Sequence, residues 1–439
     1  MVNHLDLPPP PIFYDPTTGG KSYYVTDDRG NYIAITESNA KSYLKRNGFS
    51  DKVEEGEMLS ELDDHMIDIR TNANVEYAGP LAGAQTGVRM VEHRRVLVTE
   101  PPIFIMPSKL GSYVGSTLET VLKNLLGEDQ LPYFYGWLKV GITALRAGRR
   151  RPGQALVIAG PAGCGKSLVQ NMITKLLGGR SAKPYQYMTG GTAFNSELFT
   201  AEHLMIEDEA ASFDLRIRRA LGNNIKGCVV NESQRCHPKN RQALTLYPFW
   251  RLSITLNDEA ESLIVLPPLD ESLQDKMMLL RAFKHDMPMP TDTLEQWAAF
   301  SALLELELTY FIEYLLNQWA VPGDLRCGRY GVKHYHNAEL LQMMSVLAPE
   351  TKLMELLDSE LWKESKAPSG LRMKASEIES KLCGEGSGCS HEARKLFLYQ
   401  NACGTYMGRL EKIHPDRIGR TLLHGTTIWE IEPPESMVT

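Results

Sequence analysis

A glycine-rich segment between an apolar run and a helical pattern carries the strongest chemical signal in the sequence. The apolar run covers 155–159, and the segment after it consists of Gly160, Pro161, Ala162, Gly163, Cys164, Gly165, Lys166, Ser167 and Leu168. Glycines allow successive backbone N–H groups to turn toward phosphate oxygens, and the N-terminus of the following helix adds partial positive charge. In such a loop the lysine reaches the β- and γ-phosphates, and the serine hydroxyl binds Mg²⁺. These residues therefore predict a site for ATP and Mg²⁺.

Three adjacent acids follow a second apolar segment. Residues 203–206 have the composition of a buried strand, and Glu207, Asp208 and Glu209 come directly after them. One carboxylate at the end of such a strand can hold Mg²⁺, and another can polarise the attacking water. We therefore expect Asp208 to bind the metal together with Ser167, and Glu207 or Glu209 to act as the base.

An asparagine ends a third apolar segment. Residues 249–256 have strand character, and Asn257 follows them. An amide at the end of a strand beside the phosphate-binding loop can bind the γ-phosphate or align the attacking water. Asn257 is therefore expected near Lys166, as a group that detects hydrolysis.

A polar, basic segment separates the acids from Asn257. Residues 226–241 begin with a run typical of a strand and end with Arg235, His237, Lys239 and Arg241. This pattern predicts a β-hairpin that projects from the core and carries a basic tip.

The four segments in this order resemble the motifs of superfamily 3 helicases, which are AAA+ proteins of small viruses, plasmids, phages and their satellites. The residues that carry the resemblance are GPAGCGKS, MIEDE, the basic segment around His237 and Lys239, and WRLSITLN, within about 153–283. The similarity is greatest to the phage or plasmid primase-helicase branch. It implies an α/β fold with a P-loop ATPase core over 151–290, and an ATP-dependent DNA helicase or translocase that acts in the replication of a mobile element.

The resemblance also implies an assembly and further site residues. Members form a hexameric ring with ATP between neighbours, and a hairpin from each subunit grips single-stranded DNA. Positions that match the hairpin tip are Arg235, His237, Lys239 and Arg241. Candidates for the residue that reaches a neighbour's ATP are Arg218, Arg219, Lys276 and Arg281. Lysine lacks the bidentate fork of arginine, so Lys276 departs from the family pattern.

The N-terminal part reads as a small α+β domain over 1–105, followed by a helical segment over 106–150. A hairpin is expected within 21–35, a helix over 38–46, an acidic helix near 54–68 and strands over 87–91 and 95–99. Ser116 is the expected N-cap of one helix, and a second helix is expected over 132–147. The part has no metal triad of the polymerase type, so a primase or polymerase partner would be a separate protein.

The C-terminal part is predicted to contain a helical extension over 291–345, with two amphipathic helices within 294–316, and a winged-helix domain over 346–439. Expected elements of the latter are three helices, over 351–362, 374–382 and 391–410, and a β-ribbon over 414–431. Positive charge suited to duplex DNA is supplied by Arg394, Lys395, Arg409, Arg417 and Arg420. Winged helices also serve as protein docking modules, so that alternative stays open.

Composition limits the remaining classes. The 439 residues carry a net charge of -7, so a nucleic-acid site has to be a local basic patch. No apolar stretch approaches the ~20 residues of a membrane span, and no secretory signal is evident, which predicts a cytoplasmic protein without a membrane partner. The seven cysteines form no CxxC pair, and reduced thiols are favoured over a metal or disulfide at Cys383 and Cys389.

Two other functions fit parts of the pattern. A replication initiator or signalling AAA+ NTPase would bind duplex DNA without unwinding it. A small-molecule P-loop kinase is disfavoured by Asn257 and by the basic hairpin.

Overall fold

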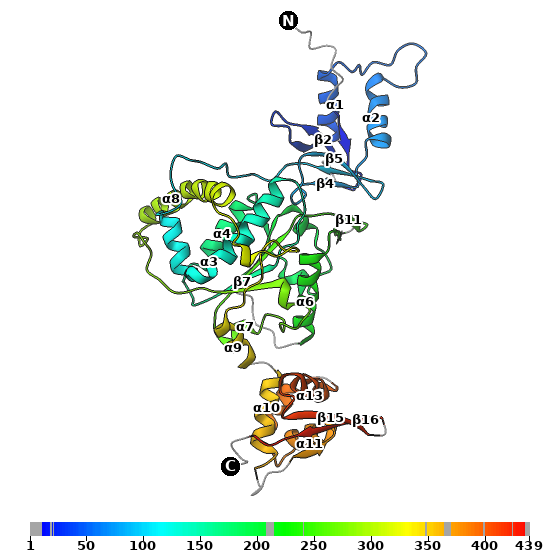
Figure 1. The fold of residues 1–439 in the computed structure, drawn as a ribbon. Helices are drawn as coiled ribbons and strands as arrows, with labels where there is room; N and C mark the ends of the chain where they lie inside the picture. Colours follow the sequence, from blue (N-terminus) through cyan, green and yellow to red (C-terminus); the bar gives the residue numbers. More distant parts are fainter. Residues whose placement is uncertain are drawn as a thin grey trace. The chain divides into compact units, whose positions relative to one another are not determined.

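The chain divides into two units, which Figure 1 traces from the N-terminus to the C-terminus. The computed structural model describes residues 11–17, 20, 22–207, 215–239, 241–346, 349–363, 370–397, 400–423 and 425–434. The first unit comprises residues up to 258 together with 265–337, and the second comprises 259–264 and 338–439.

The N-terminal part of the first unit contains two small sheets and two helices. Its elements are β1 (Phe13–Tyr14), β2 (Tyr23–Thr26), β3 (Tyr32–Ile35), α1 (Glu37–Arg46), α2 (Glu61–Asn72), β4 (Tyr77–Gly79), β5 (Gly87–Val91) and β6 (Arg94–Val98). The predicted hairpin is confirmed, since β2 and β3 pair antiparallel with Tyr23 opposite Ile35. The predicted acidic helix begins later than expected, at the N-cap Ser60.

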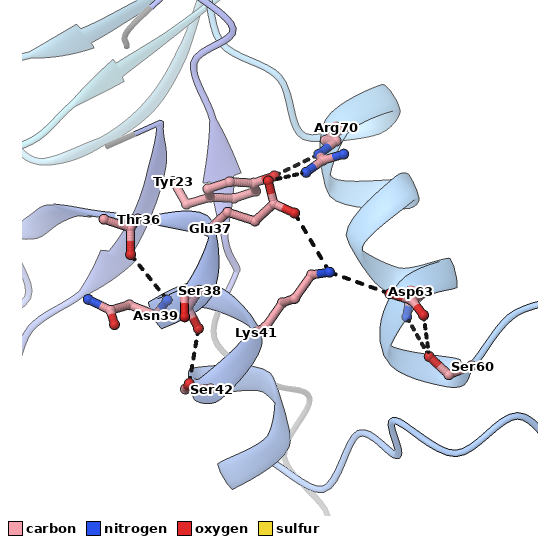
Figure 2. A network of polar contacts seen from close by, with 10 residues as sticks. All are labelled: Tyr23, Thr36, Glu37, Ser38, Asn39, Lys41, Ser42, Ser60, Asp63 and Arg70. Carbon is pink, nitrogen blue, oxygen red and sulfur yellow. Dashed lines mark hydrogen bonds and ion pairs between the residues drawn. The ribbon is translucent and has the colours of Figure 1, made fainter. Parts of the chain in front are cut away.

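Charged side chains join α1 to α2 (Figure 2). Lys41 lies 3.7 Å from Glu37 and 3.6 Å from Asp63, and Arg70 pairs with Glu37 at 2.6 Å. Arg70 also donates to the hydroxyl of Tyr23 at 2.6 Å. The ion-paired side chains are 39–49% exposed, so solvent screens them and each pair contributes little to stability.

A long helix, α3 (Thr117–Arg146), connects the N-terminal part to the central sheet. Ser116 caps it as predicted, because the hydroxyl accepts from the backbone N–H of Glu119 at 3.0 Å. The helix kinks at Gly127, whose φ of 71° suits a residue without a side chain. The two predicted helices are therefore present, but the break comes at Gly127, and Pro132 lies inside the second segment.

The central sheet has five parallel strands in the order β13-β7-β12-β9-β8. The strands are β7 (Ala155–Ala159), β8 (Ser181–Ala182), β9 (His203–Glu207), β12 (Arg251–Leu256) and β13 (Met277–Arg281). The helices α4 (Lys166–Leu176), α5 (Tyr185–Met188) and α6 (Leu215–Val230) and the 3₁₀ turns η1 (Ser196–Thr200) and η2 (Gln274–Lys276) connect them. All five residues of β7 are buried, as the apolar run predicts.

The predicted strand at the start of 226–241 is wrong, because those residues continue α6 to Val230. Leu221, Ile225, Cys228 and Val229 are buried, at the spacing of one helical face. A separate two-stranded sheet follows, formed by β10 (Gln234–Cys236) and β11 (Leu244–Leu246).

Buried polar side chains connect α4 to the strands beneath it. Gln170 donates to the Ile206 carbonyl at 3.2 Å and to Ser253 Oγ at 2.9 Å, and it accepts from Thr255 at 3.0 Å. His203 is fully buried, with Nδ1 2.7 Å from Thr174 Oγ1 and Nε2 2.8 Å from Ser253 Oγ. Burial lowers the pKa of His203 to about 3, since the charged ring would lose its hydration.

We expect the His203 ring to make the fold sensitive to acid. Below the ordinary pKa of 6.5, the unfolded chain binds a proton that the folded chain does not, so stability falls as pH decreases from 6.5 toward 3. Between about pH 8 and about pH 5.5 this single group removes ~1.4 kcal/mol from the free energy of unfolding. Urea denaturation of His203→Gln should show a pH dependence weaker by that amount, whereas the exposed His391→Gln should match the parent. Equal pH dependence in all three proteins would contradict the assignment.

The first unit ends in α8 (Leu294–Glu313), a π-helical turn η3 (Tyr314–Gln318) and a short 3₁₀ turn η4 (Gly323–Leu325). The two helices predicted within 294–316 are instead one helix that ends in the π turn. Phe300, Phe311 and Ile312 of α8 pack with α3, α4, β7 and β13 in one buried cluster.

The second unit contains five α-helices besides α7 and one three-stranded sheet among its described residues. They are α7 (Ala260–Leu263), α9 (Ala338–Val346), α10 (Pro349–Glu360), β14 (Leu371–Met373), α11 (Ala375–Cys383), α12 (Ser390–Leu396), α13 (Ala402–Ile413), β15 (Ile418–Leu423) and β16 (Thr426–Ile431). The sheet is antiparallel, in the order β14-β16-β15, and the predicted β-ribbon is confirmed as β15 and β16. The single helix predicted over 391–410 is wrong, because α12 ends at Leu396 and α13 begins after Asn401, whose φ of 66° interrupts a helix.

The thiols and the helix lengths bear on two of the expectations from sequence. All seven cysteines are free thiols, so no disulfide joins Cys383 to Cys389. Among the helices that the structure describes, none has the length and apolar character needed to cross a bilayer.

Candidate functional site

The glycine-rich loop turns at the carboxyl edge of the central sheet. β7 ends at Ala159 and α4 begins at Lys166, with Gly163 and Gly165 at φ of 71° and 110° between them. A side chain at Gly160 would come within 2.4 Å of the Ala282 carbonyl oxygen, so only glycine fits there. The loop has the conformation and the helix N-terminus that suit an anionic phosphate group.

Lys166 is buried at the start of α4 and contacts both the loop and the next strand. Its Nζ donates to the carbonyl oxygens of Gly160 at 2.7 Å and Pro161 at 2.9 Å, and to Asn257 Oδ1 at 3.1 Å. Asn257 follows β12, which pairs with β7. The structure therefore brings together the lysine and the asparagine that the sequence singled out.

The side chain of Cys164 lies within the same loop and is 2% exposed. Burial raises the pKa of this thiol, which keeps it protonated and unreactive. Ser167, by contrast, is exposed at the N-terminus of α4, where its hydroxyl is accessible.

Of the three acids, Glu207 lies at the end of β9, opposite Thr255 of β12. Lys183, which follows β8, approaches Glu207 with a separation of 3.0 Å between Nζ and Oε2. Asp208 and Glu209 lie outside the described residues. The described side chains also include no group of three or more His, Cys, Asp or Glu residues that could hold a metal ion.

The four candidates for a trans-acting residue have different surroundings. Arg218 is buried, and its guanidinium donates to the Leu266 carbonyl at 3.0 and 3.2 Å, whereas Arg219 is exposed. Lys276 pairs with its neighbour Asp275 at 2.7 Å. Arg281 lies opposite Ala159 in the sheet and 3.4 Å from Asp258, so it lies at the edge of the sheet from which the glycine-rich loop of the same chain begins.

The β10–β11 hairpin has one apolar and one basic side. Cys236, Leu244 and Leu246 are buried, whereas Arg235, His237 and Lys239 are exposed. Arg241 differs from these three, because its guanidinium lies 3.4 Å from the buried carboxylate of Asp15.

Asn195 holds the first strand of the hairpin. Its side-chain amide donates to the Arg235 carbonyl at 3.0 Å and accepts from the His237 N–H at 2.7 Å. The preceding residue, Phe194, is 48% exposed, so an aromatic ring is accessible next to the basic hairpin.

Most of the basic residues expected to contact duplex DNA already have partners within the second unit. Arg409 pairs with Glu350, Arg417 with Asp358 and Arg420 with Glu411, at 3.1, 2.7 and 3.1 Å. Arg394 donates to the Cys383 carbonyl, and Lys395 is exposed. Counting these charges from sequence overstated the positive charge that is available to a ligand.

Sequence reasoning missed four contributors to the site. Lys183 and Asp258 were not expected as partners of Glu207 and Arg281, and Phe194 and Asn195 were not expected beside the hairpin. Lys183 follows a strand of only two residues, which has no pattern of its own. Asn195 lies 40 residues before its partner Arg235 in the sequence, so no local pattern links it or Phe194 to the hairpin.

Comparison with known proteins identifies similar sequences and folds. The sequence profile of a family of unknown function (DUF5906) matches residues 158–271, the segment that contains the glycine-rich loop, Glu207, the hairpin and Asn257. No curated protein matches the sequence.

Among solved structures, the apo structure of the NrS-1 C terminal region covers 96% of this chain and 96% of its own, with a TM-score of 0.53 and 13% identity. Its A form apo structure has the same coverage, with a TM-score of 0.50 and 12% identity. A JCV helicase structure covers 42% of this chain and 53% of its own, with a TM-score of 0.25 and 13% identity, which is too low to indicate a shared fold. The chain thus has a mixed α/β fold with a parallel sheet, which resembles that of the NrS-1 C terminal region.

Proposed function

We propose that this protein is an ATP-driven DNA helicase or translocase of the superfamily 3 AAA+ class, acting in the replication of a phage, plasmid or other mobile element. The observation that carries the proposal is the contact between Lys166 Nζ and Asn257 Oδ1, in a glycine loop at the edge of a parallel sheet. In P-loop NTPases the loop lysine binds the β- and γ-phosphates. An amide at the end of the adjacent strand is close enough to bind the γ-phosphate or to align the attacking water.

The chain's own residues suit hydrolysis of ATP. In the proposed mechanism, Lys166 exchanges its loop carbonyls for phosphate oxygens, and the N–H groups of residues 163–168 surround the same phosphates. Ser167 and Asp208 would hold Mg²⁺, which supplies positive charge against the phosphates. Glu207 or Glu209 orients and deprotonates the water, and Asn257 aligns it.

Hydrolysis between subunits needs a residue that reaches the neighbour. We favour Arg219 for this role, because it is exposed on α6, whereas Arg218 is buried against Leu266. Arg281 remains with Asp258 at its own site. The subunits would form a closed ring, which we propose to be a hexamer.

The hairpin supplies the grip on single-stranded DNA. Arg235, His237 and Lys239 are exposed together, which concentrates positive charge on a protein whose net charge is -7. Phe194 adds an aromatic surface beside them, and a basic track with aromatic rings is the usual composition of a single-strand site. Ring closure would repeat this patch around a central channel.

We further propose that the second unit is a winged helix. Its chain order is α10, β14, α11, α12, α13, β15 and β16, with the hairpin of β15 and β16 as the wing. Because Arg409, Arg417 and Arg420 are paired with acids, contact of these residues with duplex DNA would have to replace ion pairs within the protein. Any primer synthesis would come from a separate primase or polymerase.

Strand separation on a forked DNA with purified protein tests the proposal directly. We expect unwinding that requires ATP and Mg²⁺, ATP hydrolysis that rises with single-stranded DNA, and rings in electron micrographs. Absence of both unwinding and stimulation would refute a helicase. Binding to duplex DNA without unwinding would instead support a replication initiator or signalling NTPase.

Replacing Phe194 by leucine is expected to weaken binding of an oligo-dT strand by about 1–3 kcal/mol, because stacking on the ring is lost. Fluorescence anisotropy measures this effect. Phe194→Trp should keep the affinity, and Trp297→Leu, which removes an aromatic side chain that is 45% exposed on α8, should not change it. Equal affinity of Phe194→Leu and the parent would exclude a stacking role.

A further inference from the structure

The apolar side of the hairpin is part of the core of the N-terminal segment. Cys236, Leu244 and Leu246 belong to one buried cluster with residues of β4, β6 and the loop after β4. The members from the N-terminal side are Tyr77, Leu81, Ala84, Val96 and Val98. Figure 1 shows β11 beside β4 accordingly. The base of the hairpin therefore packs against the N-terminal sheet and does not project freely.

A charged contact continues this attachment toward the hairpin tip. Asp15, directly after β1, is completely buried, and its Oδ2 lies 3.4 Å from Nη1 of Arg241. Oδ1 of Asp15 accepts from the backbone N–H of Thr17 at 2.8 Å. A buried carboxylate requires compensating partners, so loss of the guanidinium would leave a strongly unfavourable charge. A second arginine, Arg94 of β6, donates to the Ala243 carbonyl at 3.5 Å, just before β11.

The two sides of the hairpin are thus held by different parts of the chain. Asn195, from the segment before η1, binds the β10 side through Arg235 and His237. Asp15 and Arg94 bind the β11 side. Lys239 lies between these two attachments, within the turn from Cys236 to Leu244.

We infer that Arg241 is a positioning residue for the DNA grip: through its ion pair with Asp15, the N-terminal part sets the direction of the tip that carries His237 and Lys239. This inference rests on the proposed function of the hairpin in binding single-stranded DNA. In this role Arg241 affects DNA binding by fixing the hairpin to Asp15, and it does not itself contact a DNA phosphate. The hairpin and the N-terminal sheet accordingly move as one body.

The direction in which Asp15→Asn changes DNA affinity distinguishes a positioning role of Arg241 from direct contact with DNA. Asp15→Asn removes a negative charge beside Arg241, so a guanidinium that touched DNA would bind it equally well or more tightly. Under the positioning role, Asp15→Asn weakens binding of an oligo-dT strand by at least about fivefold, the scale of typical coupling between sites. Arg241→Met has the same effect, the double variant is no weaker than either single variant, and Arg241→Lys restores part of the affinity.

The control is Arg89→Met, an exposed arginine on β5 whose guanidinium contacts the Gln85 carbonyl. It should bind DNA like the parent, and basal ATP hydrolysis of Asp15→Asn should equal that of the parent. Unchanged or tighter DNA binding by Asp15→Asn, or additive losses in the double variant, would overturn the inference.

Hydrogen–deuterium exchange of the full chain without DNA gives a second readout. Asp15→Asn should increase exchange over 234–246 relative to the parent and to Arg89→Met, while exchange in β7 stays the same. Unchanged exchange in the hairpin would refute the attachment. If the parent protein fails to bind DNA while this exchange difference is present, the proposed function fails and the attachment stands.

Discussion

Lys166→Ala is expected to reduce ATP turnover by about 10²- to 10³-fold or more, because a buried charge that would contact the transferred phosphate is lost. The parent side chain binds two loop carbonyls and Asn257, so its amine is held inside the glycine loop that we propose binds the phosphates. Release of inorganic phosphate at saturating ATP measures the effect. Binding of a fluorescent ATP analogue should weaken as well.

Lys175→Ala provides a matched control on the same helix. Lys175 is 46% exposed and pairs with Glu305 at the surface, away from the loop. Its removal should leave turnover within about twofold of the parent, since exposed ion pairs contribute ~1 kcal/mol or less. Comparable turnover in Lys166→Ala and Lys175→Ala would show that the glycine loop does not serve ATP hydrolysis.

Lys239→Ala is expected to retain basal ATP hydrolysis and to lose its stimulation by single-stranded DNA. The side chain is exposed at the hairpin tip, and the contacts of Lys166 in the glycine loop do not involve it. Each lost phosphate contact on single-stranded DNA lowers the slope of log affinity against log salt by about 0.7. Because the proposed ring would carry the residue once per subunit, the slope should fall by several such steps.

The measurement is ATP hydrolysis with and without oligo-dT, together with DNA affinity over a range of salt concentrations. Lys52→Ala, at an exposed position in the N-terminal part, should behave as the parent. An unchanged DNA response in Lys239→Ala would show that the hairpin does not grip DNA.

Local patterns predicted much of the fold where a short stretch determines its own structure. The Ser116 cap, the β2–β3 hairpin and the buried strand β7 were predicted from neighbouring residues. Residues 226–230 were not, because a short apolar run has no periodicity that distinguishes strand from helix. The contacts of Cys228 and Val229 with the core, which come from the tertiary fold, decide for the helix.

The contacts of the candidate site also divide into those that local sequence patterns predict and those that only the tertiary fold determines. Lys166 and Asn257 could be placed together because parallel strands carry their carboxyl ends to one edge, and β7 and β12 do pair. The Asp15–Arg241 contact joins positions 226 residues apart, and no sequence pattern records it. Charge counting also failed in the second unit, where the partner acids Glu350 and Asp358 lie on a helix before the arginines that they neutralise.

The hydrogen bonds of Gln170 and His203 connect α4 to the two strands β9 and β12. Sliding α4 against β9 and β12 would break the buried hydrogen bonds of Gln170 together with the bond between Thr174 and His203. If the proposed ATP site is correct, a displacement of α4 on hydrolysis would move β9 and β12 with it, and the change would be transmitted to the loops that follow these strands.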